Sequence, residues 1–275
     1  HSFKHYSWIT WCTYLPGTRC PRSPGVPRPD QLLRLMKLLF SKTAYQKGKQ
    51  CLKALYLYKH HYKLRDPLPE ERRQRFEIGH QIGKIAHGLF PGGIDLSPAG
   101  PLQPEKSAKR TNEALESGST ILYEAAFIYN GIIIYSDILA KQQNRWHLYE
   151  VKSNIAISDT YKEDLALQYY IITHAGLPLH SASIIHLQKP LAETDLQASP
   201  SEIFITTDLT EECHQQTIKI EEHIREMQRI LIQKTKPAIS MGEHCNQPYT
   251  CEFKGFCSNE NSTPDFGLFT DSANS

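Results

Sequence analysis

A pair of acidic residues and one lysine could together form a metal-dependent hydrolytic site. Glu150 and Lys152 lie two positions apart in the run Tyr-Glu-Val-Lys (149–152), so in a strand their side chains would share a face. Asp137 lies in the preceding isoleucine-rich run 132–140, where a buried acid needs hydrogen bonds or a metal. If the two strands pair across the polar turn 141–144, Asp137 comes beside Glu150. A divalent cation with oxygen ligands would then relieve the repulsion between the two carboxylates.

Such a metal suits phosphodiester hydrolysis. Mg²⁺ or Mn²⁺ on Asp137 and Glu150 would bind a phosphate oxygen and lower the pKa of a bound water. Lys152 would orient that water or stabilise the charge that develops on the phosphoryl group. The simpler alternative is an edge strand with alternating charges or a salt bridge in the sheet, because a Glu-x-Lys triplet is common by itself. The apolar surroundings of Asp137 favour the metal site.

The elements that must position these residues follow from periodicity. Helical spacing predicts two helices before the sheet, separated from it by a loop with at most a short helix, and an Asn-Gly hairpin turn joins the first two strands. A helix with Asp159 as its cap, a further strand, an edge strand and an amphipathic helix follow. The order predicts an α/β fold whose helices cover a mixed sheet. The expected helices are 42–63, 70–90, one that Asp159 caps and that runs through 165–175, and 210–233. The loop is 97–118, and the expected strands are 120–129, 132–140, 145–152, 180–187 and 203–206.

The composition indicates a globular protein with a local basic region. The 275 residues are 40% hydrophobic, and the net charge is only +2. No apolar run reaches the roughly 20 residues that cross a bilayer, and the first residues do not resemble a signal peptide. We therefore expect a cytoplasmic protein without a membrane partner. The segment 41–65 carries seven Lys or Arg and no acid, which predicts either a solvated helix face or a nucleic-acid contact. The expected nucleic-acid-binding residues are Lys42, Lys47, Lys49, Lys53 and Tyr161.

Four short motifs resemble the PD-(D/E)XK nucleases of the RecB-like group. They read Tyr-Glu-Ala-Ala-Phe (123–127), Asp-Ile-Leu (137–139), Tyr-Glu-Val-Lys-Ser (149–153) and Asp-Leu-Ala-Leu-Gln-Tyr-Tyr (164–170). The sequence looks closest to an uncharacterised bacterial family related to CRISPR-associated exonucleases with an iron–sulfur cluster. The resemblance covers about residues 36–257. It implies a restriction-endonuclease-like core, metal ligation by Asp137 and Glu150, and catalysis by Lys152.

The resemblance also implies further site residues. Gln168 matches the Gln motif of the group, which places an amide near the active site, although the usual Tyr four residues later is Ile172 here. His87 fits a Gly-x-x-x-His pattern that supplies a metal ligand, with His80 as a weaker rival, and a surface or core histidine is the alternative. Glu124 is a further candidate metal ligand or a support for one, and an acid paired with a lysine or backbone groups is the alternative.

Three cysteines lie close together near the end of the chain. Cys245, Cys251 and Cys257 are separated by five residues each, and Cys51 lies far upstream in the first predicted helix. One early and three late cysteines resemble the layout of the cluster-bearing nucleases, which implies a 4Fe-4S cluster, although their first two late cysteines are typically closer together. Four thiolates also suit zinc, and disulfides are the third alternative. Such a cluster would join the two ends of the chain and make folding depend on metal.

The expected organisation has five parts. Residues 1–35 form a doubtful leader that is rich in Pro and Arg, 36–95 a basic helical part with one cluster cysteine, and 96–235 the nuclease core. Residues 236–257 form a cysteine-rich loop, which completes a lobe that joins the N- and C-terminal parts, and 258–275 a polar tail.

The sequence thus predicts a Mg²⁺- or Mn²⁺-dependent nuclease acting on single-stranded DNA or DNA ends. One alternative is an inactive module of the same fold that binds nucleic acid or protein. Another is a metal-storage or redox protein in which the cysteines carry the function.

Overall fold

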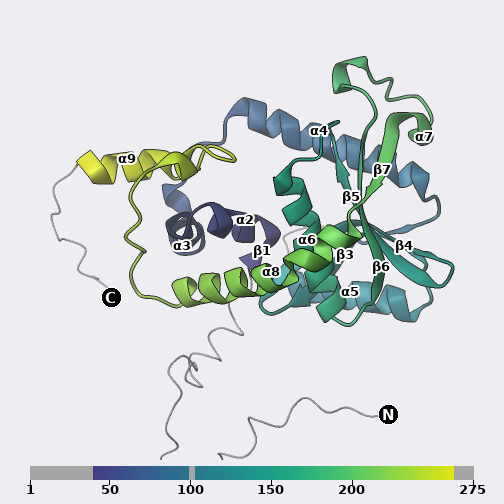
Figure 1. The fold of residues 1–275 in the computed structure, drawn as a ribbon, viewed down its shortest axis with the longest axis horizontal. Coiled ribbons are helices and arrows are strands. Elements are labelled where there is room, and N and C mark those ends of the chain that lie inside the picture. Colours follow the sequence, from purple (N-terminus) through teal and green to yellow (C-terminus); the bar gives the residue numbers. More distant parts are fainter. Residues whose placement is uncertain (1–39, 99–102, 263–275) are drawn as a thin grey trace, which may run out of the picture.

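The computed structural model describes residues 40–98 and 103–262, and they form an α/β fold. Within this part of the chain, a mixed sheet of seven strands is flanked by helices (Figure 1). The strand order is β2-β3-β4-β5-β6-β7, and the short strand β1 pairs with β4 outside this path. The predicted α/β class with a mixed sheet is confirmed.

The centre of the sheet is an antiparallel meander, as predicted. Asn130 and Gly131 have φ values of 47° and 75°, as expected for the hairpin turn between the first two strands. The second turn is shorter than expected, since only Gln143 and Asn144 form it, with φ values of 48° and 62°. The strands are β1 (Phe40–Ser41), β2 (Ile94–Asp95), β3 (Ile121–Tyr129), β4 (Ile132–Gln142), β5 (Arg145–Lys152), β6 (Leu179–Leu187) and β7 (Phe204–Asp208). Strand β6 is parallel to β5, and β7 is an antiparallel edge strand.

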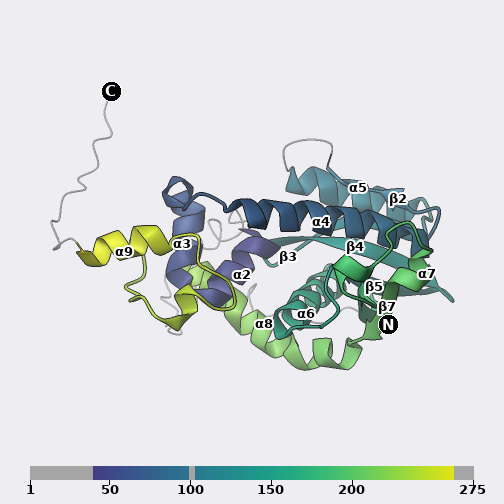
Figure 2. The same ribbon diagram turned by 90° about the horizontal axis from the view of Figure 1, so that it is seen from above.

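Helices cover both faces of the sheet. Figure 2 shows α4 (Glu70–Ala86) and α5 (Pro104–Glu116) on one side, and α6 (Asp159–His174) and α8 (Thr210–Leu231) on the other. The residue that caps α6 is Ser158 rather than the predicted Asp159, because the Ser158 side chain accepts from the Tyr161 amide. The remaining helices are α2 (Lys42–Gln50), α3 (Leu52–His60), α7 (Pro200–Ile203) and α9 (Lys254–Ser262), with 3-10 turns at 62–64, 87–89, 191–193 and 243–245. No helix in the described ranges is both long enough and apolar enough to cross a membrane.

The predicted single helix over 42–63 is wrong, because the chain breaks at Cys51. This residue is extended, with φ −163° and ψ 119°, and it ends α2 and begins α3. Neither Gly nor Pro marks the break. Cys51 instead lines a pocket together with residues of the late segment, 239–257. The chain therefore changes direction where it contacts a distant part of the sequence.

The segment 97–118 contains a full helix, α5, rather than a loop with a short helix. Its buried positions are Ser107, Thr111 and Ala114, which are small residues at helical spacing. Thr111 accepts a hydrogen bond from the Ala126 amide of β3 at 2.9 Å and donates to Ser107 O at 3.2 Å. A face of small and hydroxyl side chains carries little hydrophobic periodicity, which explains why the pattern of apolar residues misses this helix.

Two expected boundaries differ from the structure. Strands β1 and β2 fall within the predicted helical part 36–95 but belong to the sheet. Helix α9 crosses the predicted boundary at residue 257 and runs to Ser262. The predicted leader 1–35 and the tail from residue 263 lie outside the described residues.

Candidate active site

Asp137 lies in β4, in the interval between the parts of this strand that pair with β1 and with β5. Along one edge of β4, β1 pairs with residues 132–133 and β5 with residues 138–142. Asp137 lies between these two ladders, where its Oδ2 accepts a 2.7 Å hydrogen bond from the Val151 amide. The structure therefore places Asp137 beside the residue that follows Glu150, near the position that strand pairing predicts.

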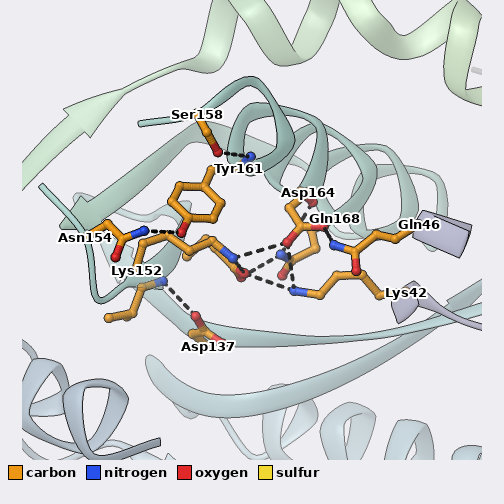
Figure 3. A network of polar contacts seen from close by, with 11 residues as sticks. Lys42, Gln46, Asp137, Lys152, Asn154, Ser158, Tyr161, Asp164 and Gln168 are labelled. Atoms are coloured by element: carbon orange, nitrogen blue, oxygen red, sulfur yellow. Dashed lines mark hydrogen bonds and ion pairs between the residues drawn. The ribbon is translucent and has the colours of Figure 1, made fainter. Parts of the chain in front are cut away.

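Glu150 lies at the centre of a buried polar network. The residue is only 2% exposed, and its Oε1 receives Lys152 Nζ at 2.7 Å and Lys42 Nζ at 2.9 Å. Its Oε2 accepts from Gln168 Nε2 at 2.6 Å. Figure 3 shows Lys152 and Lys42 reaching toward each other from opposite sides, with Gln168 between them. Both carboxylate oxygens of Glu150 are thus held by donors from separate elements.

Asp164 is a site residue that sequence reasoning did not assign. Its Oδ2 lies 3.1 Å from Lys152 Nζ and 3.8 Å from Lys42 Nζ, and its Oδ1 accepts a hydrogen bond from Gln46 Nε2. A signal for Asp164 was present, because it precedes Gln168 by one helical turn in a motif that resembles the nucleases. Gln46 and the position of Lys42 carry no such signal, since both depend on contacts between distant parts of the chain.

Burial and charge act together on the ionisable groups of this network. Burial lowers the pKa of Lys42 and of Lys152, but the Glu150 and Asp164 carboxylates outweigh burial and raise both pKa values. Burial raises the pKa of Glu150, yet the two ammonium groups and its hydrogen bonds hold that pKa well below its usual range. Burial, followed by the charge of Glu150, raises the pKa of Asp137. The surrounding charges therefore favour the ionised form of Glu150, whereas burial and the charge of Glu150 disfavour the ionised form of Asp137.

Glu124 lies in β3, opposite Asp137 of β4. The β3–β4 ladder pairs Tyr123 with Ile138 and Ala125 with Ser136 but omits the pair Glu124 and Asp137. Glu124 has φ 53°, a left-handed conformation that is strained for a residue with a long side chain. Burial and the charge of Glu150 raise its pKa to about 7. The predicted candidate ligand therefore lies within electrostatic range of Glu150.

The structure does not place His87 with the carboxylates around Glu150. The His87 ring stacks on Tyr123, with centroids 3.8 Å apart, and Tyr123 belongs to the cluster that packs under α4. Glu150 instead reaches α6 on the other side of the sheet. Burial lowers the pKa of His87, with an opposing effect from Asp95. The rival His80 is exposed.

The lysines predicted to bind nucleic acid are all engaged with acids. Lys42 reaches Glu150, and the other three form ion pairs with Glu252, Glu163 and Glu260, as follows: Lys47–Glu252 at 2.9 Å, Lys49–Glu163 at 3.4 Å and Lys53–Glu260 at 2.8 Å. Tyr161 lies beside the acid network, because its ring centroid is 4.9 Å from Lys152 Nζ and its hydroxyl accepts from Asn154 at 2.6 Å.

The four predicted cluster cysteines line one pocket between α3 and the late segment. All four are free thiols. Burial and the other three thiols raise the pKa of Cys251. Cys213 is buried in α8, apart from this pocket. No group of three or more His, Cys, Asp or Glu side chains in the described ranges has the arrangement of a metal site.

A scan against protein-family models finds no match to this sequence, and a search of curated proteins finds none either. The likeness to PD-(D/E)XK nucleases thus stays a prediction based on the motifs and on the chemistry of the site.

Proposed function

We propose that this protein is a divalent-metal-dependent nuclease that hydrolyses DNA phosphodiester bonds, with a restriction-endonuclease-like core. The observation that carries the proposal is the convergence of Asp137, Glu150, Lys152 and Gln168, which come from two strands and a helix. An ordinary salt bridge in a sheet does not require a second acid, here the partly exposed Asp137, beside the buried one. It also does not require a buried amide on the same carboxylate.

The chemistry of the donors fits a Mg²⁺ or Mn²⁺ ion. Asp137 and Glu150 would hold it, with Glu124 as a candidate third carboxylate, because such ions prefer oxygen ligands. The raised pKa of Asp137 reflects burial and a repulsion that a cation would relieve. Gln168 Oε1 is also buried without a hydrogen-bond partner in the described chain. The ion would act as a Lewis acid that lowers the pKa of water and polarises a phosphate oxygen.

The protein's own residues would supply position and charge. Gln168 orients Glu150 by binding its Oε2, and the Val151 amide orients Asp137. Lys152 keeps its proton because the carboxylates raise its pKa, so it presents a positive charge near the acids. That charge would stabilise the negative charge that develops on the phosphoryl group during hydrolysis.

Single strands or free ends are the proposed form of the DNA. Tyr161 lies next to Lys152, and Tyr249 is 44% exposed and lies within electrostatic range of Tyr161. Tyrosine rings stack on unpaired bases, which are accessible only outside a duplex.

We also propose that Cys51, Cys245, Cys251 and Cys257 hold a 4Fe-4S cluster, with zinc as the alternative. The four thiols line one pocket, and four thiolates are a sufficient set for either metal group. The cluster would fasten the late segment to α3. The free thiols also suit the reducing conditions of the proposed cytoplasmic location.

The direct test is cleavage of end-labelled single- and double-stranded DNA by anaerobically purified protein with Mn²⁺. We expect metal-dependent cleavage that EDTA abolishes, with single-stranded DNA as the better substrate. Asp137→Ala and Lys152→Ala should each lower the rate at least about 100-fold, because each removes a group that acts on the reacting phosphate.

The matched control is Lys109→Ala, which removes an exposed lysine of α5 that pairs with Glu113 on the same helix. Its rate should equal that of the wild type. Circular dichroism and urea unfolding should show that the two site variants remain folded. Binding of DNA without cleavage by the wild type would contradict the nuclease and favour the binding module.

A further inference from the structure

Lys152 is held by two carboxylates, only one of which is a proposed metal ligand. Its Nζ lies 2.7 Å from Glu150 Oε1 and 3.1 Å from Asp164 Oδ2. Lys152 also faces the Tyr161 ring at 4.9 Å. Glu150 and Asp164 approach the same ammonium from a strand and from a helix. Figure 3 shows Asp164 close to the end of the Lys152 side chain.

A cation bound to Glu150 would weaken the ion pair between Glu150 and Lys152. The Glu150 carboxylate would then share its charge with the ion, so its attraction for the Lys152 ammonium would fall. Asp164 is not among the proposed ligands, and its attraction would persist. In the metal-loaded site, Asp164 is therefore the carboxylate that determines where the Lys152 ammonium lies.

The orientation of Asp164 is itself fixed by a residue from another part of the chain. Gln46 of α2 donates to Asp164 Oδ1, so Oδ2 faces Lys152 Nζ at 3.1 Å, with Lys42 Nζ farther away at 3.8 Å. Asp164 is only 6% exposed, so water competes little for these bonds. A lysine side chain has several rotatable bonds, and a catalytic ammonium that is held in place before the reaction does not have to be ordered during it.

We propose that Asp164, oriented by Gln46, is a positioning residue that holds Lys152 in place for phosphodiester cleavage. This inference rests on the proposed nuclease function. It adds α2 to the elements that build the active site, and it gives Asp164 a role distinct from metal ligation.

A double-mutant cycle separates this role from a merely structural one. Asp164→Asn keeps the size of the side chain and removes its charge. We expect the variant to lower kcat about 10–100-fold, as for loss of a supporting partner of an active-site group, with KM and Mn²⁺ affinity close to wild type. Because Asp164 acts through Lys152, the double variant Asp164→Asn with Lys152→Ala should cleave no more slowly than Lys152→Ala alone.

Gln46→Ala supplies a second, independent cycle. It should lower kcat in the wild type by less than Asp164→Asn does, and it should have no effect when Asp164 is already Asn. The matched control is Asp159→Asn, at the exposed start of α6, which should leave kcat unchanged. Urea unfolding of each variant checks that the loss of rate is not a loss of fold.

Three other outcomes would each contradict a different claim. Additive losses in both cycles with an active wild type would overturn the positioning role alone. A parallel loss of Mn²⁺ affinity in Asp164→Asn would show that Asp164 ligates the metal instead. Absence of cleavage by the wild type would overturn both this inference and the proposed function.

Discussion

The pKa values of single carboxylates in this protein are shifted in opposite directions where Glu150, Asp137 and Glu124 lie near one another. Two ammonium groups and the Gln168 amide outweigh the burial of Glu150 and lower its pKa, whereas burial, followed by the charge of Glu150, raises the pKa values of Asp137 and Glu124. Carboxylates of one site thus have pKa values shifted in opposite directions. Such shifts are typical of functional sites and also of structural ion-pair networks.

Glu124 leads to a prediction about stability and pH. Its pKa is about 7 in the folded chain, against 4.5 as the ordinary value, so folding takes up a proton between these pH values. Stability must therefore fall as the pH rises from about 4.5 to 7. Glu124→Gln removes this loss, and in EDTA it should stabilise the protein by about 1–3 kcal/mol above pH 7.

Urea unfolding at a series of pH values measures this difference. At pH 4 the two proteins should be equally stable, because Glu124 is then protonated in both the folded and the unfolded chain. An equal difference at every pH would show that the substitution acts through packing rather than through the proton.

At the scale of elements, short polar contacts join helices to strands. Helix α5 covers β3 partly through Thr111, which is fully buried and accepts from the Ala126 amide at 2.9 Å. Helix α2 follows β1 directly, and its first residue, Lys42, thereby enters the acid network. In the first case the helix supplies the side-chain acceptor for the Ala126 amide. In the second case it adds Lys42 to the two donors, Lys152 and Gln168, that already hold Glu150.

Thr111→Val tests the contact between α5 and β3. Valine has nearly the same shape but leaves the Ala126 amide without its acceptor, so we expect the free energy of unfolding to fall by about 1–3 kcal/mol. The amide of Ala126 should also exchange its hydrogen faster than in the wild type.

Thr111→Ser is the matched variant, because it keeps the hydroxyl and removes one methyl group, at a cost of about 0.8 kcal/mol. If the valine variant were as stable as the serine variant and kept slow exchange at Ala126, this hydrogen bond would not support the contact.

At the scale of the whole molecule, the late segment returns to the beginning of the described chain. Phe253 is 1% exposed and packs against Ala54 and Leu57 of α3. Asp66 accepts from the Gly255 amide at 2.9 Å, and its own amide donates to Glu252 O. These contacts surround the pocket of the four cysteines, so the proposed cluster would reinforce a closure that side-chain packing already makes.

Cys51→Ser should remove the proposed cluster and weaken this closure. Anaerobically purified wild type should contain about four iron atoms per chain, and the variant should lose most of them together with the visible absorption. Urea should then unfold the variant at a lower concentration, and proteases should cut the segment 236–257 sooner, because metal binding contributes to folding.

Cys213→Ala is the control, since Cys213 lies in α8 apart from the pocket, and its iron content should match the wild type. If the wild type binds zinc instead of iron, the four cysteines remain the proposed ligands and only the metal changes. A wild type without bound metal would contradict the cluster.

The sequence by itself determined the features that depend on neighbouring residues. Alternation and turn preference, which act over a few residues, predict three strands (120–129, 132–140 and 145–152), the Asn130-Gly131 turn and the shared face of Glu150 and Lys152. The structure has these strands with ends that differ by at most two residues. The α/β class follows from the order of such elements.

Only the tertiary structure decided the rest of the site. Lys42 and Glu150 lie 108 positions apart, and Gln46 and Asp164 lie 118 apart, so no local pattern links them. The sequence of a basic segment does not reveal whether its lysines face solvent or carboxylates. The break at Cys51 has no Gly or Pro at that position to predict it. Packing of α2 and α3 against distant elements determines both the partner of Lys42 and the break at Cys51, because these contacts are made only when the chain folds.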